Sequence, residues 1–268
     1  MRAPRILYRW YAKRLRRKLN ADLLPAHVAV AMDGNRRWAR QQGFDDPGIG
    51  HRYGAEHLDD LLAWCAGIGI AHVTVYVAST DNLTKRAGGE VAHLMSMIET
   101  IVAERLMHPG NPWRLHLAGR LDDLPDSTAH ALETARDATA DRTGGHLTVA
   151  IGYDGQAEIV DAVRSLLETE AAQGATIDDL AERLTAADIG AHRYTPDLPA
   201  ADLIIRTSGE RRLSSFLLWQ SAGAELSFCD VYWPGFRHID FLRALRDYTE
   251  RRLTRQAEAA RRESARAA

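Results

Sequence analysis

The chain has 268 residues, with 34 Lys and Arg against 36 Asp and Glu and a net charge of −2. This near-balance argues against a protein that binds nucleic acid over its whole surface. No run of about 18 apolar residues predicts a membrane span, and no signal peptide is evident. The cysteines Cys65 and Cys229 stand far apart, in no metal-ligand spacing, as is typical of thiols in a reducing compartment. We therefore expect a cytoplasmic protein with one large domain.

Residues 1–22 form a basic segment that includes a predicted helix from about Ile6 to Leu19. Apolar residues recur along it at steps of four, with arginines between them, at Leu7, Tyr11, Leu15 and Leu19. The apolar stripe is narrow, and it favours a helix that docks on the body of the protein. The alternative is a helix that lies on an anionic membrane surface, anchored by Trp10 and the arginines. The protein would then be peripheral at the inner face of the membrane.

Strand-like and helix-like segments alternate through the rest of the chain. Short β-branched and apolar runs predict strands near residues 27–32, 73–78, 115–118, 147–151 and 203–205. Helical spacing of apolar residues predicts helices near 55–67, 91–106, 127–138, 157–170, 177–184 and 186–190. This alternation predicts an α/β fold in a single domain over residues 23–254, with a central, mostly parallel sheet and helices on both faces. Residues 255–268 form a charged tail that we expect to be a fraying helix or disordered.

The first strand ends in a carboxylate, a glycine and several arginines. In open α/β sheets, ligands collect beyond the carboxyl ends of the strands. Asp33 could hold a hard cation such as Mg²⁺ against a phosphate, and Gly34 would let a ligand approach the backbone. The arginines that could neutralise the remaining anionic charge are Arg36, Arg37 and Arg40. The alternative interpretation is a turn followed by a capped helix with a solvated basic face.

A second arginine cluster lies between Asp202 and Phe228. Arg206 and Arg212 bracket a short loop, and guanidinium groups about 4 Å apart repel by roughly 4 kcal/mol at an effective dielectric near 20. A diphosphate would offset this repulsion through bidentate hydrogen bonds, whereas the alternative is a surface salt-bridge network. Glu225, ahead of another apolar run, is a candidate ligand.

Together, the two clusters predict a cleft for two diphosphates and a Mg²⁺ ion. A nucleotide would normally bring a GxxxxGK loop followed by Ser or Thr, or a GxGxxG turn after a strand, and the chain has neither. The apolar wall of the cleft indicates that the phosphates carry hydrocarbon.

From about Leu24 to Arg252 the chain resembles the cis-prenyltransferase family, the undecaprenyl diphosphate synthase-like enzymes. The resemblance rests on HVAVAMDGNRRWA, TVYVASTDN, the GYDG turn, DLIIRTSGERRLSSFLLWQ with AELSF, and YWPGF. It implies a single α/β domain with an apolar tunnel, a homodimer, and Mg²⁺-dependent transfer of prenyl groups. The substrates would be isopentenyl diphosphate and an allylic prenyl diphosphate.

The resemblance also implies roles for individual residues. Asp33 would be the essential carboxylate linked to Mg²⁺, and Glu225 would share the ion. Residues that would cradle the allylic diphosphate are Gly34, Asn35, Arg36, Arg37 and Trp38, with His51 nearby. Residues on the isopentenyl side are Ser79, Thr80, Asp81, Lys85, Arg206, Arg212, Leu213 and Ser214. Asn82 matches the residue assigned to proton removal; because a neutral amide is a poor base, we expect Asn82 to orient the substrate while a diphosphate oxygen takes the proton.

Four departures from the family pattern make the chain look more like the bacterial short-chain members, the (2Z,6E)-farnesyl diphosphate synthases. They are Asp81-Asn82-Leu83 for Glu-Asn-Trp, Asp45-Asp46-Pro47 in place of an arginine, Lys85 for another arginine, and Arg252-Leu253-Thr254 for Arg-x-Gly. Val77, where many long-chain relatives carry alanine, would stop elongation early, although the small neighbouring Ala78 argues the other way.

We therefore expect an enzyme that condenses isopentenyl diphosphate with geranyl diphosphate to give (2Z,6E)-farnesyl diphosphate. Mg²⁺ and the arginines would stabilise the departing diphosphate while the isopentenyl double bond attacks the allylic carbon. One alternative is a long-chain polyprenyl diphosphate synthase, and another is head-to-middle coupling on the same fold. An alternative of another class is a non-catalytic partner subunit that binds lipid diphosphate, although such subunits typically lose the aspartate and loop arginines that remain here.

Overall fold

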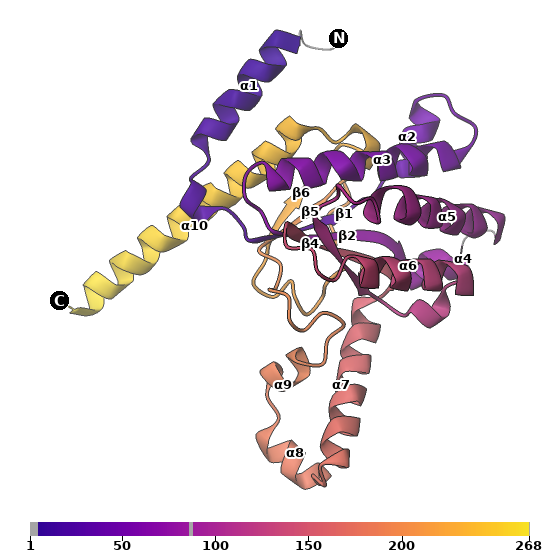
Figure 1. Ribbon diagram of the computed structural model, residues 1–268. Coiled ribbons are helices and arrows are strands. Elements are labelled where there is room, and N and C mark those ends of the chain that lie inside the picture. Colours follow the sequence, from indigo (N-terminus) through magenta and orange to yellow (C-terminus); the bar gives the residue numbers. More distant parts are fainter. Residues whose placement is uncertain (1–4, 86–87, 268) are drawn as a thin grey trace.

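The computed structural model describes residues 5–85 and 88–267, and its central feature is a six-stranded sheet (Figure 1). The strands are β1 (His27–Ala31), β2 (His72–Ser79), β3 (Trp113–Ala118), β4 (Gly145–Tyr153), β5 (Leu203–Arg206) and β6 (Glu225–Phe228). Their order is β3-β4-β2-β1-β5-β6, and every neighbouring pair is parallel. The predicted α/β fold with a parallel sheet is confirmed, and β6 is a strand that the sequence did not predict.

Helices connect the strands in the predicted places. The α-helices are α1 (Arg5–Lys18), α2 (Asn35–Gln41), α3 (Pro47–Ala66), α4 (Thr80–Lys85), α5 (Gly88–Ile101), α6 (Asp126–Ala138), α7 (Gly155–Ala172), α8 (Ile177–Arg183), α9 (Ala186–Gly190) and α10 (His238–Ala267). A π-helical turn, η2 (Val102–Leu106), extends α5, and short 3₁₀ turns are η1 (Ala21–Leu23), η3 (Leu121–Asp123) and η4 (Trp233–Gly235).

The two faces of the sheet are covered differently. Val28 and Val30 of β1 face a large core to which α3, α5, α6 and α10 contribute. Ala29 and Ala31 face a smaller core, built from β4 and from the irregular segment 191–224. All five residues of β1 are buried, which explains its continuous apolar sequence. Helices cover the first face, and the segment 191–224 covers the second together with the start of α7, where Glu158 accepts a hydrogen bond from the buried Tyr153 hydroxyl.

The connections of the sheet change direction between β1 and β5. From β1 the chain moves to β2 on one side, and from β5 it moves to β6 on the other. Ligands of open α/β sheets bind at such a switch point, beyond the carboxyl ends of the strands. Ala31 pairs with Arg206 in the ladder, so the residues that follow β1 and those that follow β5 emerge side by side.

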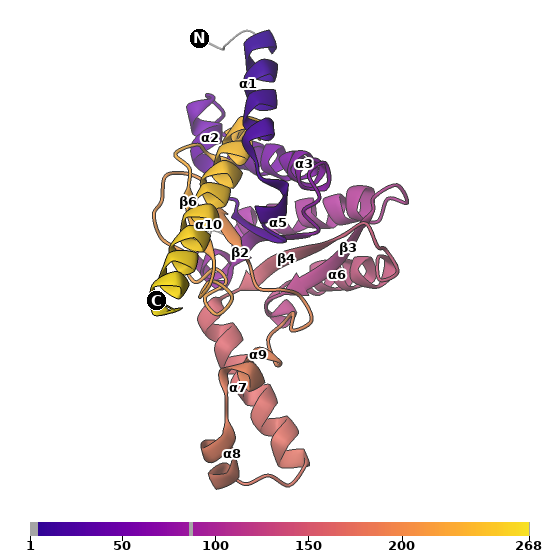
Figure 2. The ribbon, with the colours of Figure 1, turned by 90° about the vertical axis from the view of Figure 1, so that its left-hand side faces the viewer.

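Three elements project from this body (Figures 1 and 2). The long helix α7 and the short helices α8 and α9 form an arm on one side. The amino-terminal helix α1 packs on the first part of α10, where Leu15 contacts Ile239 and Leu242. The second half of α10 is exposed and remains helical to Ala267, where we expected a frayed or disordered tail.

Candidate active site

A cavity of about 560 Å³ lies at the carboxyl ends of β1, β2 and β5. Most of the predicted site residues line it, namely Asp33, Gly34, Asn35, Arg36, Arg37, Arg40, His51, Ser79, Asp81, Asn82, Arg206, Arg212 and Ser214. The rest of its wall is formed by Tyr76, Val77, Ala78 and Glu210, together with Ala31 and Met32 at the end of β1. The fold thus brings both arginine clusters to one cavity at the switch point.

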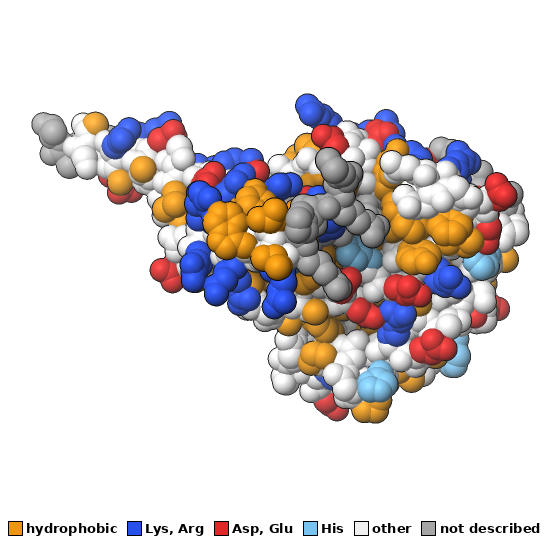
Figure 3. All heavy atoms as spheres, turned by 90° about the horizontal axis from the view of Figure 1, so that it is seen from above, with side chains coloured by type: hydrophobic (Ala, Val, Ile, Leu, Met, Phe, Trp, Pro, Cys, Tyr) orange, Lys and Arg blue, Asp and Glu red, His pale blue; other side chains and the backbone are white. Residues whose placement is uncertain are grey.

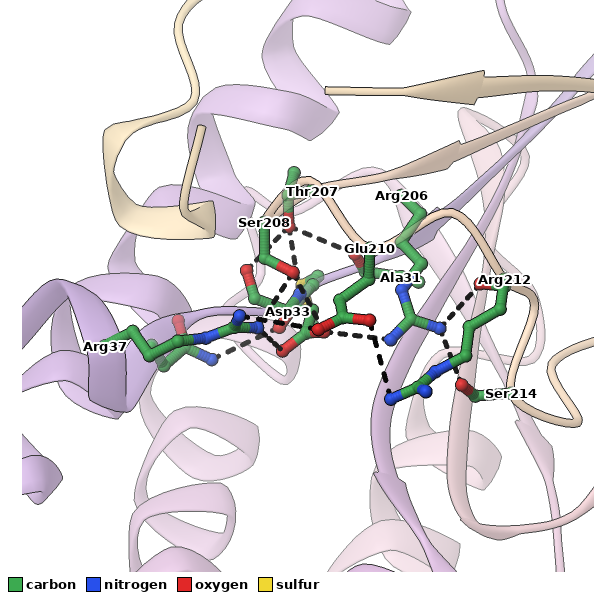
Figure 4. A network of polar contacts seen from close by, with 11 residues as sticks. Ala31, Asp33, Arg37, Arg206, Thr207, Ser208, Glu210, Arg212 and Ser214 are labelled. Carbon is green, nitrogen blue, oxygen red and sulfur yellow. Dashed lines mark hydrogen bonds and ion pairs between the residues drawn. The ribbon is translucent and has the colours of Figure 1, made fainter. Parts of the chain in front are cut away.

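Asp33 is the centre of the polar network in this cavity (Figure 4). Its Oδ1 accepts a hydrogen bond from Arg37 Nη2 at 3.2 Å, and its Oδ2 accepts one from Arg206 Nη2 at 3.0 Å. The Ser208 hydroxyl also donates to Oδ2, at 3.0 Å. Burial alone would raise the pKa of Asp33, but the Ser208 hydroxyl and the guanidinium groups of Arg206 and Arg37 outweigh it and hold the pKa below its usual value. Asp33 is therefore an ionised carboxylate at neutral pH.

Arg206 and Glu210 join the two clusters. The buried Arg206 guanidinium also donates through Nη1 to the Arg212 carbonyl at 2.7 Å and to the Ser214 hydroxyl at 2.8 Å. The Glu210 carboxylate lies between the two clusters, 3.7 Å from Arg37 Nη1 and 3.5 Å from Arg212 Nη2 (Figure 4). The Arg212 side chain is 70% exposed, so its guanidinium is open to an anion in the cavity.

The loop after β5 has an unusual backbone. Four non-glycine residues in it have positive φ angles: Ser208 at 82°, Ser214 at 51°, Ser215 at 62° and Leu217 at 50°. Such conformations cost about 1 to 3 kcal/mol each and cluster at ligand sites. The loop is held by the Arg206 hydrogen bonds and by Phe216, which is fully buried and stacks on Tyr76 with ring centroids 4.7 Å apart.

Glycines shape the wall of the cavity on the side of α2 and α3. Gly34 has a φ of 103°, and a Cβ there would lie 2.6 Å from the Tyr232 ring. The sequence predicted that Gly34 leaves room for a ligand, but in the structure the close neighbour is Tyr232, over whose ring the Arg37 guanidinium lies at 5.4 Å. Gly50 and Gly54, one turn apart on α3, let α2 pack close, because a Cβ at either would collide with Asn35.

Several predicted residues have other roles. Trp38 is absent from the cavity wall and packs with Tyr53 at 5.0 Å, in an aromatic group on α2 and α3. The Thr80 hydroxyl donates to the Gly152 carbonyl at 3.3 Å, and Leu213 packs on the smaller core. The side chain of Lys85 lies outside the described part of the structure.

The position of Glu225 does not agree with the shared metal site that we predicted. Glu225 pairs with Leu203 at the amino end of β5, whereas Asp33 follows the carboxyl end of β1. The two residues are separated by two strand spacings of about 5 Å each and by about 10 Å or more along the strands. The Glu225 carboxylate instead contacts two arginines of α10, Arg251 at 2.8 Å and Arg255. Within one chain, Glu225 and Asp33 cannot hold the same ion.

A second, apolar cavity of about 80 Å³ adjoins the polar one. Both cavities are lined by Met32, Asn35, His51 and Val77, so they share one wall. The inner part is enclosed by α3, α5, η2, α6 and β4, through Leu58, Leu94, Ile98, Val102, Leu106, Leu132 and Val149. The polar cavity thus leads to a hydrocarbon-lined pocket, as expected for a phosphate that carries an apolar chain.

Three residues of the site, Thr207, Ser208 and Tyr232, have contacts that were not predicted. Thr207 accepts a hydrogen bond from the Asp33 amide at 3.0 Å, and Ser208 donates to the Asp33 carboxylate. Their position directly after Arg206 was a signal that could have identified them. Tyr232 comes from a distant part of the chain, and no local pattern indicated its contact with Gly34 and Arg37.

Comparison with known proteins agrees with this site. Residues 31–256 match the family described as putative undecaprenyl diphosphate synthase. The chain is 55% identical to an isoprenyl transferase of Streptomyces fradiae over 94% of this chain and 98% of the relative. It is 48% identical to a (2Z,6E)-farnesyl diphosphate synthase of Mycobacterium tuberculosis over 91% of this chain and 94% of the relative.

The fold is also similar to a solved structure, lavandulyl diphosphate synthase from Lavandula x intermedia in complex with dimethylallyl diphosphate. The TM-score is 0.79 at 28% identity, over 85% of this chain and 96% of the other. The predicted resemblance is therefore confirmed: the chain belongs to the undecaprenyl diphosphate synthase family of cis-prenyltransferases.

Proposed function

We propose that the protein is a short-chain cis-prenyltransferase, which condenses isopentenyl diphosphate with an allylic diphosphate such as geranyl diphosphate and forms a Z double bond. The observation that carries this proposal is the cavity in which Asp33 and Glu210 hold two sets of arginines beside an apolar pocket. Prenyltransferase relatives over almost the whole chain support it, including two named (2Z,6E)-farnesyl diphosphate synthase.

The two diphosphates would occupy opposite sides of the Asp33 carboxylate. The allylic diphosphate would lie on the α2 side, near Gly34, Arg37 and Arg40. Isopentenyl diphosphate would lie on the loop after β5, where Arg212 and Ser214 have polar groups directed into the cavity. Each guanidinium that now contacts a carboxylate could bind a diphosphate oxygen with a stronger, bidentate geometry.

The residues of the site fit a Mg²⁺ ion. Asp33 is an ionised hard-oxygen ligand at the cavity wall, and Mg²⁺ is commonly bound by one or two carboxylates together with substrate phosphates. No group of three or more His, Cys, Asp or Glu in the described residues is placed to hold a metal by itself. This is consistent with an ion that arrives with a diphosphate. When bound, Mg²⁺ would neutralise charge on the departing diphosphate.

The protein groups would act mainly by positioning and by charge. Arg36, Arg37 and Arg40 would stabilise the diphosphate as the allylic carbon–oxygen bond breaks. Asn82 lies in the first turn of α4, where its backbone N–H donates to the Ser79 hydroxyl at 3.0 Å. From there its neutral amide would orient isopentenyl diphosphate, while a diphosphate oxygen removes the proton.

The product is short in this proposal because the apolar cavity is small and Val77 narrows its junction with the polar one. The test is to incubate the pure enzyme with geranyl diphosphate, labelled isopentenyl diphosphate and Mg²⁺ and to analyse the product by chromatography and NMR. We expect one condensation and a Z double bond. Long polyprenyl products would contradict the chain length. A branched product would favour head-to-middle coupling, the alternative that the lavandulyl diphosphate synthase neighbour raises. Absence of turnover with any allylic donor would favour the non-catalytic subunit.

We also propose that the protein is a homodimer, as the family resemblance suggests, and that it is located in the cytoplasm, as the composition suggests. Light scattering after size-exclusion chromatography would give the mass in solution. A monomeric mass at micromolar concentration would contradict the dimer.

A further inference from the structure

The two sides of α1 differ in their surroundings. One side packs on α10, where Leu15 is 2% exposed. Arg243 of α10 lies over the Tyr11 ring at 5.3 Å, and Arg16 donates to the Gly67 carbonyl at 2.7 Å. The body of the protein therefore sets which side of α1 points outward. The predicted docking of this helix accounts for only part of its apolar surface.

The outward side begins with three large apolar side chains. Ile6 is 80% exposed, Leu7 57% and Trp10 59%. Trp10 lies four residues after Ile6 and three after Leu7, so its ring joins the two into one continuous patch on the first turns of the helix. Figure 3 looks down on this helix and shows hydrophobic side chains flanked by Lys and Arg. This patch differs from the stripe expected from the sequence, because Tyr11, Leu15 and Leu19 face α10.

The rest of the outward side is strongly basic. Exposed basic side chains lie beside and after the apolar patch, at Arg9, Lys13, Arg14, Arg17 and Lys18. The helix contains no acidic residue, although the whole chain has a net charge of −2. The Arg14 guanidinium lies 5.5 Å from the Trp10 ring, so the apolar and basic groups are interleaved. The positive charge is thus concentrated where apolar side chains are exposed.

We propose that this face of α1 binds the surface of a bilayer that contains anionic lipids. Ile6, Leu7 and Trp10 would enter the boundary between headgroups and acyl chains, while the basic side chains contact lipid phosphates. A second copy of the chain is a poor occupant, because a symmetric contact would bring two basic helices together. In the described residues no helix is long and apolar enough to cross a membrane, so the contact is with the surface. The inference does not depend on the reaction catalysed.

The apolar half of the contact is tested by cosedimentation of the full chain with vesicles. Vesicles of pure phosphatidylcholine are compared with vesicles of equal parts phosphatidylcholine and phosphatidylglycerol. We expect binding to the anionic vesicles only, and a decrease of about tenfold or more in the partition coefficient for Trp10→Glu and for Leu7→Glu. The matched control is Ile177→Glu. Ile177 is 71% exposed on α8 of the arm, away from α1, so its substitution should not change vesicle binding.

The basic half is tested by Arg14→Glu with Arg17→Glu, against Arg261→Glu with Arg262→Glu on the exposed end of α10. We expect only the first pair to weaken binding by about tenfold, and added salt to weaken the wild type in the same way. Circular dichroism and turnover with detergent-dispersed substrates should be unchanged in all variants. The proposal is wrong if the wild type binds neither vesicle, if Trp10→Glu binds as the wild type does, or if Ile177→Glu weakens binding equally. A change of oligomeric state in Trp10→Glu without loss of vesicle binding would also overturn it.

Discussion

Both edges of the sheet carry titratable side chains but organise them differently. At the carboxyl edge, Asp33 and Arg206 line an open cavity of about 560 Å³. At the amino edge, histidines from four adjacent strands contact one another instead. His72 and His146 stack with ring centroids 4.7 Å apart, and His116 Nε2 lies 2.9 Å from His146 Nδ1.

His27 extends this row on β1, with its Nε2 2.8 Å from the Thr74 hydroxyl. At the carboxyl edge the loops diverge at the switch point and leave charged groups partly open to a ligand, whereas at the amino edge the imidazole rings pack on one another, and His72 Nδ1 is buried there with no hydrogen-bond partner. A row of titratable side chains therefore does not by itself make a site. A site also needs unfilled space next to the polar groups.

The largest effect is expected from Asp33→Ala. Loss of this carboxylate removes the proposed Mg²⁺ ligand and the counter-ion of the buried Arg206, so kcat should fall by about a thousandfold or more. The control is Asp59→Ala, because Asp59 pairs with Arg105 outside the cavity. Steady-state kinetics and circular dichroism distinguish loss of activity from loss of fold. Wild-type turnover in a folded Asp33→Ala protein would contradict the assignment of the site.

A smaller effect is expected from Arg206→Lys. One ammonium group cannot contact Asp33 and the Ser214 hydroxyl at the same time, as the Arg206 fork does. We expect kcat/KM for isopentenyl diphosphate to decrease by about a hundredfold. Arg105→Lys, at an exposed pair, should change it less than about twofold. If both variants behave alike, the Arg206 fork has no special role.

The role of the histidine row at the amino edge is tested by measuring the free energy of unfolding as a function of pH. Burial, together with the positive charge of neighbouring groups, lowers the pKa of His27, His72, His116 and His146, and that of His116 to about 4. In the unfolded chain these groups would titrate near 6.5. Between these values the unfolded state binds more protons, so the free energy of unfolding should be constant above about pH 6.5 and decrease as the pH falls toward 4.

Denaturant unfolding at several pH values measures this slope. His146→Gln removes one of the two inner rings of the row. It should reduce the loss of unfolding free energy between about pH 6.5 and 4. It should also cost about 1 kcal/mol at neutral pH, because the stacking and the contact with His116 are lost. If the free energy of unfolding of the variant depends on pH below 6.5 as that of the wild type does, other groups control the stability at acid pH.

The smallest change is expected from Val77→Ala, which affects product length rather than rate. Removing two methyl groups at the junction of the cavities should let the product grow by about one isoprene unit in a fraction of turnovers. Val75→Ala is the matched control, because Val75 lies on the same strand but in the buried core. Radiochromatography of the products measures the distribution, and equal shifts in both variants would exclude a specific role for Val77.

Most of the fold and much of the site could be predicted from local patterns. Short β-branched and apolar runs predicted β1 to β5, and polar residues directly after β1, β2 and β5 predicted the lining of the cavity. The short β6 was missed because it has only four residues and begins with a charged side chain, Glu225, which α10 neutralises through Arg251. The motif did not reveal that the Trp38 side chain packs on Tyr53 while its neighbours line the cavity.

The sequence by itself determined the parallel α/β class, the family, and the identity of the charged residues that follow the strands, because these depend on local periodicity and on short motifs. Only the tertiary structure decided which of those residues meet. Strand order places Asp33 beside Arg206 and Ser208 at the switch point, and the ladder register places Glu225 at the opposite edge. Long-range strand order and register are set by packing across the whole sheet, which no local pattern records.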